Sequence, residues 1–335
     1  MRVLFLGGTG NISAACVERA LELGHEVTVL NRGRRASALG ERVTTVLGER
    51  DDAALLRRIA QGTRFDSVVD FLAYRPEQVE AAIQAFAGRV GQYVFISSAS
   101  AYQKPVAHYL ITEQTPLANP FWEYARQKIA CERRLSAAPE LPVTIVRPSY
   151  TYGPSWIPSA FGGQDYTVVD RMRRGRPIAV PGDGSALWVM TASSDFAAGL
   201  AGLLGLPAAV GEAFHITSDE VMSWDAIYGA IARAAGVLAE LVHVPTDLIA
   251  ALDPEGAGSL RGDKAWSVVF DNSKIKRFVP GYRARAGFAD GIARSLAWYD
   301  ADASRRTVSA PANERIDRVI AAQRRALGTP MPAER

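Results

Sequence analysis

Short β-rich runs alternate with helical patterns over residues 1–150, and this alternation constrains the fold more than any other feature. Several apolar runs are continuous, which is typical of strands covered on both faces. The expected strands are Arg2–Leu6, His25–Leu30, Val43–Leu47, Ser67–Leu72, Tyr93–Ser97 and Val143–Val146. The expected helices are Ser13–Leu23, Asp51–Gln61, Pro76–Phe86 and Glu123–Leu135. The pattern predicts an α/β fold with a doubly wound parallel sheet of the Rossmann type, whose ligands lie beyond the carboxyl ends of the strands.

The second half of the chain is less regular and predicts a smaller, mixed α/β substrate lobe. We expect a dinucleotide-binding domain over residues 1–150, to which a segment near 186–218 returns, and a substrate-binding lobe over residues 151–300. Residues 301–335 are predicted to form a helical tail. Its arginines are interpreted as a solvated helix face. They are Arg315, Arg318, Arg324 and Arg325.

The first strand runs into a glycine-rich turn, GGTGNIS at residues 7–13, and a helical pattern follows. Glycines let the backbone approach a diphosphate closely, and a helix N-terminus offers free N–H groups and a positive dipole end. Ser13 stands where a third glycine usually permits close helix–strand packing, and serine is small enough for that place. The residues expected to bind a dinucleotide here are Gly7, Thr9, Gly10, Asn11 and Ile12.

The end of the second strand bears on the choice between NAD and NADP. An acidic residue at this place would bind the adenosine ribose hydroxyls and repel a 2′-phosphate. The chain instead has Asn31 followed by Arg32, Arg34 and Arg35. Guanidinium groups match phosphate geometry, so the sequence favours NADP while leaving NAD open. The alternative is that Arg34 and Arg35 are loop charges that face solvent.

Three polar residues after the fifth strand predict the chemistry. Tyr124 and Lys128 lie four residues apart in a helical pattern and therefore project from one face. A free phenol has a pKa of about 10, and a nearby ammonium together with an oxidised nicotinamide ring favours its phenolate form. Tyr124 can then exchange a proton with a substrate hydroxyl during hydride transfer. Ser98, at the strand end, can hold and align the same substrate oxygen.

With these residues the chain resembles the extended short-chain dehydrogenase/reductases, in the group of NAD-dependent epimerase/dehydratases that act on nucleotide sugars. The shared motifs are the GGTG turn, Ser98 before Tyr102, Tyr124 with Lys128, and the run RPSYTYGP at residues 147–154. The resemblance implies that the segment after Arg147-Pro148 lies along the nicotinamide, that residues 49 and 50 border the adenine, and that subunits pair as a homodimer. The expected cofactor contacts in these later segments are Glu49, Arg50, Leu72, Ala73, Tyr124, Lys128, Pro148, Ser149 and Tyr150.

Departures from the family pattern bear on the substrate. Family dehydratases carry an Asp-Glu pair directly after the catalytic hydroxyl residue, whereas this chain has Ala99 and Ser100. Neither can act as a carboxylic acid, so 4,6-dehydration is disfavoured, and Ser100 is a candidate substrate contact. Trp188 stands near the place of one diphosphate-binding arginine and could stack on a base or sugar. Arg261 matches the second diphosphate-binding arginine.

Three functions follow from these motifs. The first is an NAD(P)-dependent epimerase or oxidoreductase that acts on a sugar or nucleotide sugar. The second is an NADPH-dependent ketoreductase for a carbonyl substrate without a nucleotide. The third is a non-catalytic relative that binds stem-loop RNA, against which the intact Ser98, Tyr124 and Lys128 and the net charge of +3 both argue.

Composition sets the remaining expectations. Cys16 and Cys131 are the two cysteines, which is typical of a protein in the reducing cytoplasm. The N-terminal run MRVLFLGG is interpreted as a first strand and not as a signal peptide. The most apolar later stretch, residues 189–210, contains Asp195 and Pro207, so no membrane span is expected. No metal site is expected.

Overall fold

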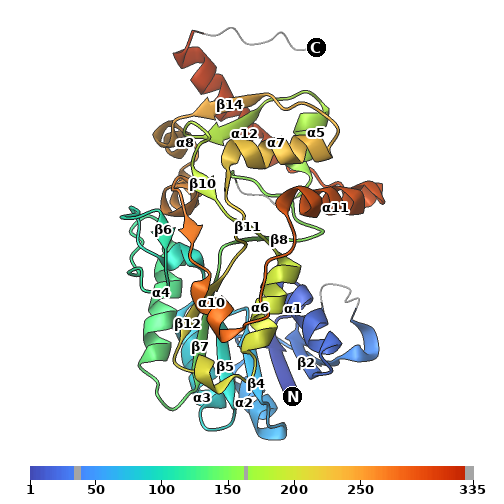
Figure 1. The fold of residues 1–335 in the computed structure, drawn as a ribbon, viewed down its shortest axis with the longest axis vertical. Coiled ribbons are helices and arrows are strands. Elements are labelled where there is room, and N and C mark those ends of the chain that lie inside the picture. The colour runs from blue at the N-terminus through green and yellow to red at the C-terminus, as the bar shows by residue number, and fades with distance from the viewer. Residues whose placement is uncertain (34–38, 162–164, 329–335) are drawn as a thin grey trace.

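A seven-stranded sheet with all neighbours parallel forms the centre of the first part of the chain (Figure 1). This computed structural model describes residues 1–33, 39–161 and 165–328. The strands are β1 (Arg2–Leu6), β2 (Glu26–Asn31), β3 (Thr44–Leu47), β4 (Ser67–Asp70), β5 (Gln92–Ile96), β7 (Val143–Pro148) and β12 (Ala213–Ile216). Their order is β12-β7-β5-β4-β1-β2-β3, so the winding direction reverses beside β1. Ligands of doubly wound sheets bind at such a reversal.

Helices cover both faces of the sheet, which confirms the predicted Rossmann-type fold. One face carries α1 (Asn11–Glu22), α6 (Ser193–Leu203) and α10 (Ser273–Phe278). The other carries α2 (Ala53–Gly62), α3 (Pro76–Phe86) and α4 (Glu123–Ser136). Strand β1 serves both cores, because Val3 and Phe5 point to the first set of helices and Leu4 and Leu6 to the second. Local signals set the helix starts: Pro76 opens α3, and the Asp52 carboxylate accepts a hydrogen bond from the Leu55 N–H at 2.9 Å before α2.

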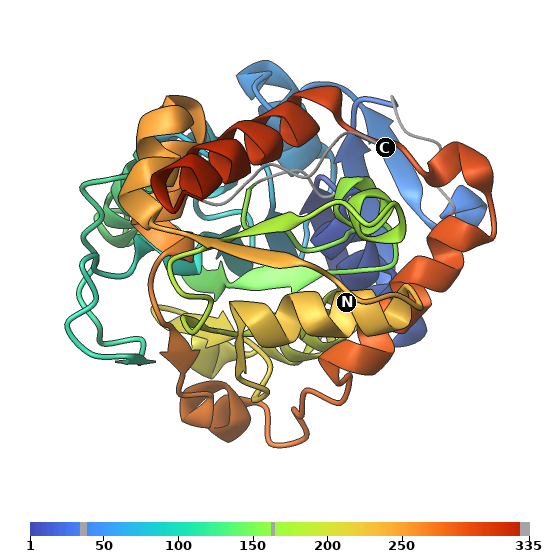
Figure 2. The same cartoon turned by 90° about the horizontal axis from the view of Figure 1, so that it is seen from above.

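A smaller lobe with its own apolar core lies over the carboxyl ends of the strands (Figures 1 and 2). Its short strands pair as β8 (Tyr150–Tyr152) with β11 (Met190–Ala192), β9 (Ile178–Pro181) with β14 (Leu241–Val244), β10 (Leu187–Trp188) with β13 (Met222–Ser223), and β6 (Leu110–Ile111) with β15 (Val269–Phe270). Its helices are α5 (Thr167–Arg173), α7 (Trp224–Ala234), α8 (Thr246–Leu252), α9 (Pro254–Ser259), α11 (Phe288–Asp300) and α12 (Ala310–Ala326). Single turns are η1 (Gly40–Arg42), η2 (Ala99–Ala101), η3 (Pro207–Ala209), the π-helical turn η4 (Leu260–Lys264) and η5 (Ala303–Arg305).

The C-terminal helix α12 lies within the predicted helical tail at residues 301–335 and packs against the lobe. Its residues Ile316, Val319 and Ile320 are buried in the core of the lobe, and the helix lies across α8, β9 and β14 (Figure 2). Its polar side also contacts the lobe, since Arg324 pairs with Glu240 at 2.5 Å. None of the helices within the described ranges is long and apolar enough to span a membrane.

Candidate active site

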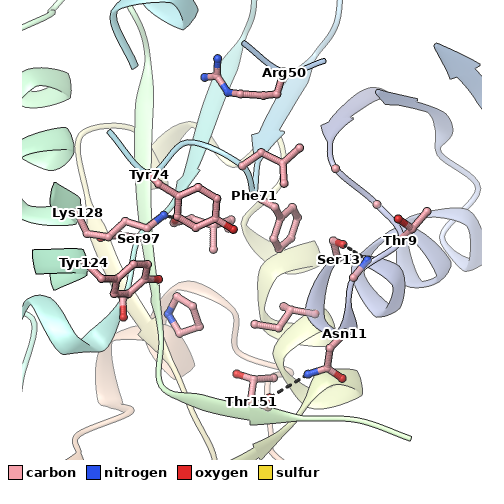
Figure 3. Close-up of a pocket in the computed structure, with 18 of the residues that line it drawn as sticks. Thr9, Asn11, Ser13, Arg50, Phe71, Tyr74, Ser97, Tyr124, Lys128 and Thr151 are labelled. Carbon is pink, nitrogen blue, oxygen red and sulfur yellow. Dashed lines mark hydrogen bonds between the residues drawn. The ribbon is translucent and has the colours of Figure 1, made fainter. Parts of the chain in front are cut away.

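One cavity of about 760 Å³ lies where the carboxyl ends of the sheet strands meet the lobe. Its wall begins at the glycine-rich turn after β1 and passes the ends of β2, β3, β4 and β5. It then continues along α4, the connection from β7 to β8 and the π-helical turn η4. Figure 3 shows the turn and α1 on one side, with Thr9, Asn11 and Ser13, and Tyr74, Tyr124 and Lys128 on the opposite side.

The glycine-rich turn forms a cradle whose geometry needs glycine. Gly7 has φ +94°, which L side chains rarely adopt, and a Cβ on Gly8 would lie 2.6 Å from Val29 Cγ1. The Gly10 N–H donates to Ser13 Oγ at 3.0 Å, so Ser13 has a bonding role of its own. Helix α1 begins at Asn11, two residues earlier than predicted, and its first three residues line the cavity. The first N–H groups of a helix have no partner inside the helix, so they are available to a ligand there. This cradle fits a dinucleotide diphosphate.

Asn11 also joins the cradle to the lobe. Its amide Nδ2 donates to the Thr151 carbonyl at 2.9 Å (Figure 3), while its Oδ1 is buried without a hydrogen-bond partner among the described residues. A Cβ on Gly153 would lie 2.2 Å from this oxygen, so glycine is needed there as well. All five residues predicted in this turn line the cavity: Gly7, Thr9, Gly10, Asn11 and Ile12.

The ends of β2 and β3 form the part of the cavity wall next to the cradle. Asn31 and Arg32 line it, and Asn31 Oδ1 accepts a hydrogen bond from the Gly33 N–H at 2.8 Å. Glu49 lines the wall as well. The predicted contributions of Arg34 and Arg35 lie outside the described residues.

Arg50 lines the same wall, but a buried carboxylate holds its guanidinium. Arg50 Nη2 lies 2.6 Å from Asp70 Oδ2, and both side chains are almost fully buried. Asp70 Oδ1 in turn accepts hydrogen bonds from the backbone N–H groups of Leu72 at 2.9 Å and Ala73 at 3.0 Å. Asp70 therefore shapes the loop after β4, a role that sequence reasoning missed although an aspartate ends this apolar strand.

The two predicted contacts in the loop after β4 have different outcomes. Leu72 lines the cavity, whereas Ala73 is fully buried and is not part of the cavity wall. The Ala73 carbonyl instead accepts a hydrogen bond from Lys128 Nζ at 2.7 Å. Ala73 therefore bonds to Lys128 from outside the cavity wall, and its contact with a cofactor stays a prediction.

Ser98, Tyr124 and Lys128 all line the cavity opposite the cradle. Lys128 Nζ donates to the carbonyls of Ala73 and Ile96 and lies 5.8 Å from the centre of the Tyr124 ring. Burial lowers the pKa of Lys128 to about 8. Burial raises the pKa of Tyr124 above its ordinary value, and hydrogen bonding with Ser98 opposes that rise. In the free protein the phenol is thus the stable form of Tyr124 at neutral pH.

Tyr74 is a wall residue that sequence reasoning did not single out. Its ring centre lies 4.5 Å from Lys128 Nζ and 6.2 Å from the Tyr124 ring, so it covers the ammonium on the cavity side (Figure 3). No motif marks this tyrosine, because it follows the strand end by four residues in an irregular loop.

The remaining predicted residues around Tyr124 also line the cavity. Ser98 Oγ lies 2.8 Å from Ser100 Oγ, which places two hydroxyls side by side next to Tyr124. Pro148, Ser149 and Tyr150 are part of the same cavity wall.

Trp188 and Arg261, the two candidate diphosphate or base contacts, do not line the cavity. Trp188 is 1% exposed and packs 5.2 Å from the Trp224 ring in the core of the lobe. Arg261 is exposed and pairs with Asp247 at 2.8 Å. Neither side chain is part of this cavity wall, because motif order along the chain does not fix the direction of a side chain.

Potential metal ligands are dispersed. Across the described ranges, no three His, Cys, Asp or Glu side chains come together as metal ligands would.

Comparison with known proteins supports this geometry. Residues 3–216 match the NAD dependent epimerase/dehydratase family. The 2'-dehydrokanamycin reductase of Streptomyces kanamyceticus is 29% identical over 86% of this chain and 81% of its own length. The chloroplast stem-loop binding protein of 41 kDa b of Arabidopsis thaliana is 26% identical over 72% of this chain and 65% of its own length.

The fold is shared with solved structures. DesIV, a dTDP-glucose 4,6-dehydratase from Streptomyces venezuelae solved with NAD and TYD bound, superposes with a TM-score of 0.72 at 24% identity and covers 91% of this chain and 98% of its own. The family match extends from β1 through β12, so it includes the cradle and the Ser98, Tyr124 and Lys128 group. The chain is an enzyme of the NAD dependent epimerase/dehydratase family, built on the extended short-chain dehydrogenase/reductase fold.

Proposed function

We propose that the enzyme reduces a ketone on a sugar-like substrate without a nucleotide, using NADPH in preference to NADH. The observation that carries this proposal is the composition of the cavity wall. The described wall contains only two arginines, Arg32 and Arg50, and both lie at the cofactor end. A nucleotide sugar brings a diphosphate, which proteins usually bind through guanidinium groups. The substrate end of the described wall offers none.

One of the relatives supports reduction as the reaction. The relative that aligns with 86% of this chain is named a reductase. Ala99 and Ser100 stand where the family dehydratases have an acid pair, so elimination of water lacks its proton carriers.

The residues of the chain have separate roles in binding the cofactor and in transferring the proton. The cradle at residues 7–12 and the ends of β2 and β3 would hold NADPH, which supplies the hydride when bound. The Tyr124 phenol donates a proton to the carbonyl oxygen, and the Ser98 hydroxyl binds the same oxygen and aligns it. The Lys128 ammonium stabilises the phenolate that remains on Tyr124.

NADPH consumption tests the proposal. The purified protein, free of bound cofactor, should oxidise NADPH when a hydroxylated ketone is added, with one alcohol formed per NADPH. Protein that retains oxidised cofactor through gel filtration, and that interconverts nucleotide-sugar epimers without consuming added NADPH, would contradict it and favour an epimerase.

Arg32 is the described residue that should select NADPH. Arg32→Asp is expected to lower the ratio of kcat/KM for NADPH to that for NADH by about tenfold to hundredfold, since a charge-assisted hydrogen bond is lost and a repulsion added. Arg58→Asp, the same charge change on an exposed position of α2 outside the cavity wall, is the control. Equal effects of both substitutions would show a general charge effect and contradict this assignment.

The pH dependence of reduction should follow Lys128. Because burial lowers the pKa of Lys128 to about 8, its ammonium form is present below that pH and lost above it. The value of kcat/KM, which reports ionisations of the free enzyme, should be level near pH 6–7 and fall about tenfold per pH unit above pH 8. Arginine keeps its positive charge over this pH range, so any activity that remains in Lys128→Arg should not decrease above pH 8. A native profile that stays level up to about pH 10 would contradict the role of the ammonium.

A further inference from the structure

Three charged side chains lie close together at the substrate end of the cavity, outside the catalytic group. Asp263 and Lys264 line the cavity and belong to the π-helical turn η4. Lys104 is 3% exposed, does not line the cavity, and lies near enough to Asp263 for the two charges to interact. A π-helical turn is rare and often occurs at a functional site.

The three charges have no hydrogen-bond or ion-pair partner among the described residues. The Lys104 ammonium is buried without a hydrogen bond. Burial raises the pKa of Asp263, while the positive charges of Lys264 and Lys104 oppose the rise. Burial likewise lowers the pKa of each lysine, and the charge of Asp263 opposes that change. Buried charges without partners are costly, so a ligand that supplies hydrogen bonds at this place would be favoured.

Asn119 links the turn that carries Asp263 and Lys264 to the segment that carries Ser98 and Ser100. Its Nδ2 donates both to the Ser100 carbonyl at 2.8 Å and to the Gly262 carbonyl at 2.7 Å. Gly262 also packs so tightly that an added Cβ would lie 2.7 Å from the Trp122 side chain. The turn that presents Asp263 is therefore held against the segment that presents Ser98 and Ser100.

Trp122 is an aromatic part of the cavity wall and contacts both Tyr124 and Lys264. The centre of its ring lies 4.8 Å from the centre of the Tyr124 ring and 5.4 Å from Lys264 Nζ. The charge of Asp263 also acts on Tyr124 and Tyr150, since it contributes to the raised pKa of each phenol. Tyr124, Trp122 and Asp263 all line the same cavity, so a ligand that fills the cavity from Tyr124 past Trp122 also meets Asp263.

We propose that Asp263 and Lys264 bind two neighbouring hydroxyls of a neutral, polyhydroxylated ketone ring, with Trp122 forming one wall of its site. The inference rests on the proposed function and names its substrate class. A carboxylate only accepts hydrogen bonds and an ammonium only donates them, whereas a hydroxyl does both, so a vicinal diol satisfies the pair. A hydroxyl carries no charge, so it can bond to the carboxylate and to the ammonium without being repelled by either, and the proposed ring is neutral.

The test uses inosose, a pentahydroxycyclohexanone, and cyclohexanone, the same ring without hydroxyls. Native enzyme should reduce inosose with a kcat/KM at least about tenfold above that for cyclohexanone. Asp263→Asn and Lys264→Met should each raise the KM for inosose by about tenfold to hundredfold, with a smaller change in kcat. Arg261→Met, on the same turn but paired outside the cavity, is the control and should match the native enzyme.

Binding of inosose without NADPH, measured by isothermal titration calorimetry, separates this inference from the proposed function. Inosose that binds, and that loses affinity in Asp263→Asn and Lys264→Met but is not reduced, would support the diol site and overturn the proposed reaction. Reduction of inosose with an unchanged KM in both variants would overturn the diol site alone. The diol site would also be overturned if inosose did not bind, or if the anion glucuronate bound more tightly than inosose. Thermal unfolding of each variant checks that the chain remains folded.

Discussion

Replacing Tyr124 with phenylalanine is expected to lower kcat/KM for ketone reduction by about 10²- to 10⁴-fold, the usual contribution of a positioned acid. The change removes one hydroxyl and leaves the ring, which packs against Trp122 and Tyr74. The cradle at residues 7–12 lies across the cavity (Figure 3), so NADPH affinity, measured by fluorescence titration, should stay within about twofold of the native value.

Tyr74 provides the matched control, because it presents a second phenol to the same cavity. Its contact with Lys128 is made through the ring, 4.5 Å from Nζ, and phenylalanine preserves that contact. Tyr74→Phe should therefore change kcat/KM by less than about threefold. Loss of activity in Tyr74→Phe together with retention in Tyr124→Phe would assign the proton to Tyr74 and contradict our scheme.

The parts of this site that the sequence predicted are those set by short segments. A glycine turn between an apolar strand and a helix has few conformations, so residues 7–12 could be placed from their order alone. Tyr124 and Lys128 are one helical turn apart and share a face once α4 forms. The parallel sheet follows from the alternation of strands and helices, which leaves few alternative topologies.

The parts that were missed depend on contacts between distant segments. Lys104, Asp263 and Asn119 come together only because η4 packs against the loop before α4, and no local pattern predicts that contact. Trp188 and Arg261 occupy the motif positions that were expected, but packing in the lobe turns one into the core and the other to solvent. Family motifs indicate where a residue stands in the chain and not which way its side chain points.

A buried ion pair beneath the active site leads to the largest expected effect on stability. Arg147 Nη2 lies 2.6 Å from Glu132 Oε2, with both side chains almost fully buried. Ser97 Oγ donates to Glu132 Oε1 at 2.5 Å, so this carboxylate joins α4 and β7 to the segment just before Ser98. The network continues through Tyr102, whose hydroxyl accepts from Arg147 at 3.2 Å and lies 3.0 Å from His215 Nδ1.

Glu132→Ala should lower the free energy of unfolding by about 3–5 kcal/mol, because it leaves the Arg147 guanidinium buried without its counter-charge. Glu123→Ala is the matched control on the same helix. Glu123 pairs with Arg126 at the same 2.6 Å, but both side chains are exposed, so its loss should cost no more than about 1 kcal/mol. Urea denaturation followed by circular dichroism measures both variants.

The double substitution of Glu132 and Arg147 by methionine separates the cost of an unpaired charge from the value of the pair itself. If the unpaired guanidinium causes the loss, removing both charges should restore most of the stability that Glu132→Ala removes, since an apolar pair of similar volume needs no counter-charge. Activity should not recover to the same extent, because Ser97 would still lack the acceptor that fixes the segment before Ser98. A double variant that is less stable than Glu132→Ala would show that the ion pair contributes net stability, and the role assigned to the buried charge would then be wrong.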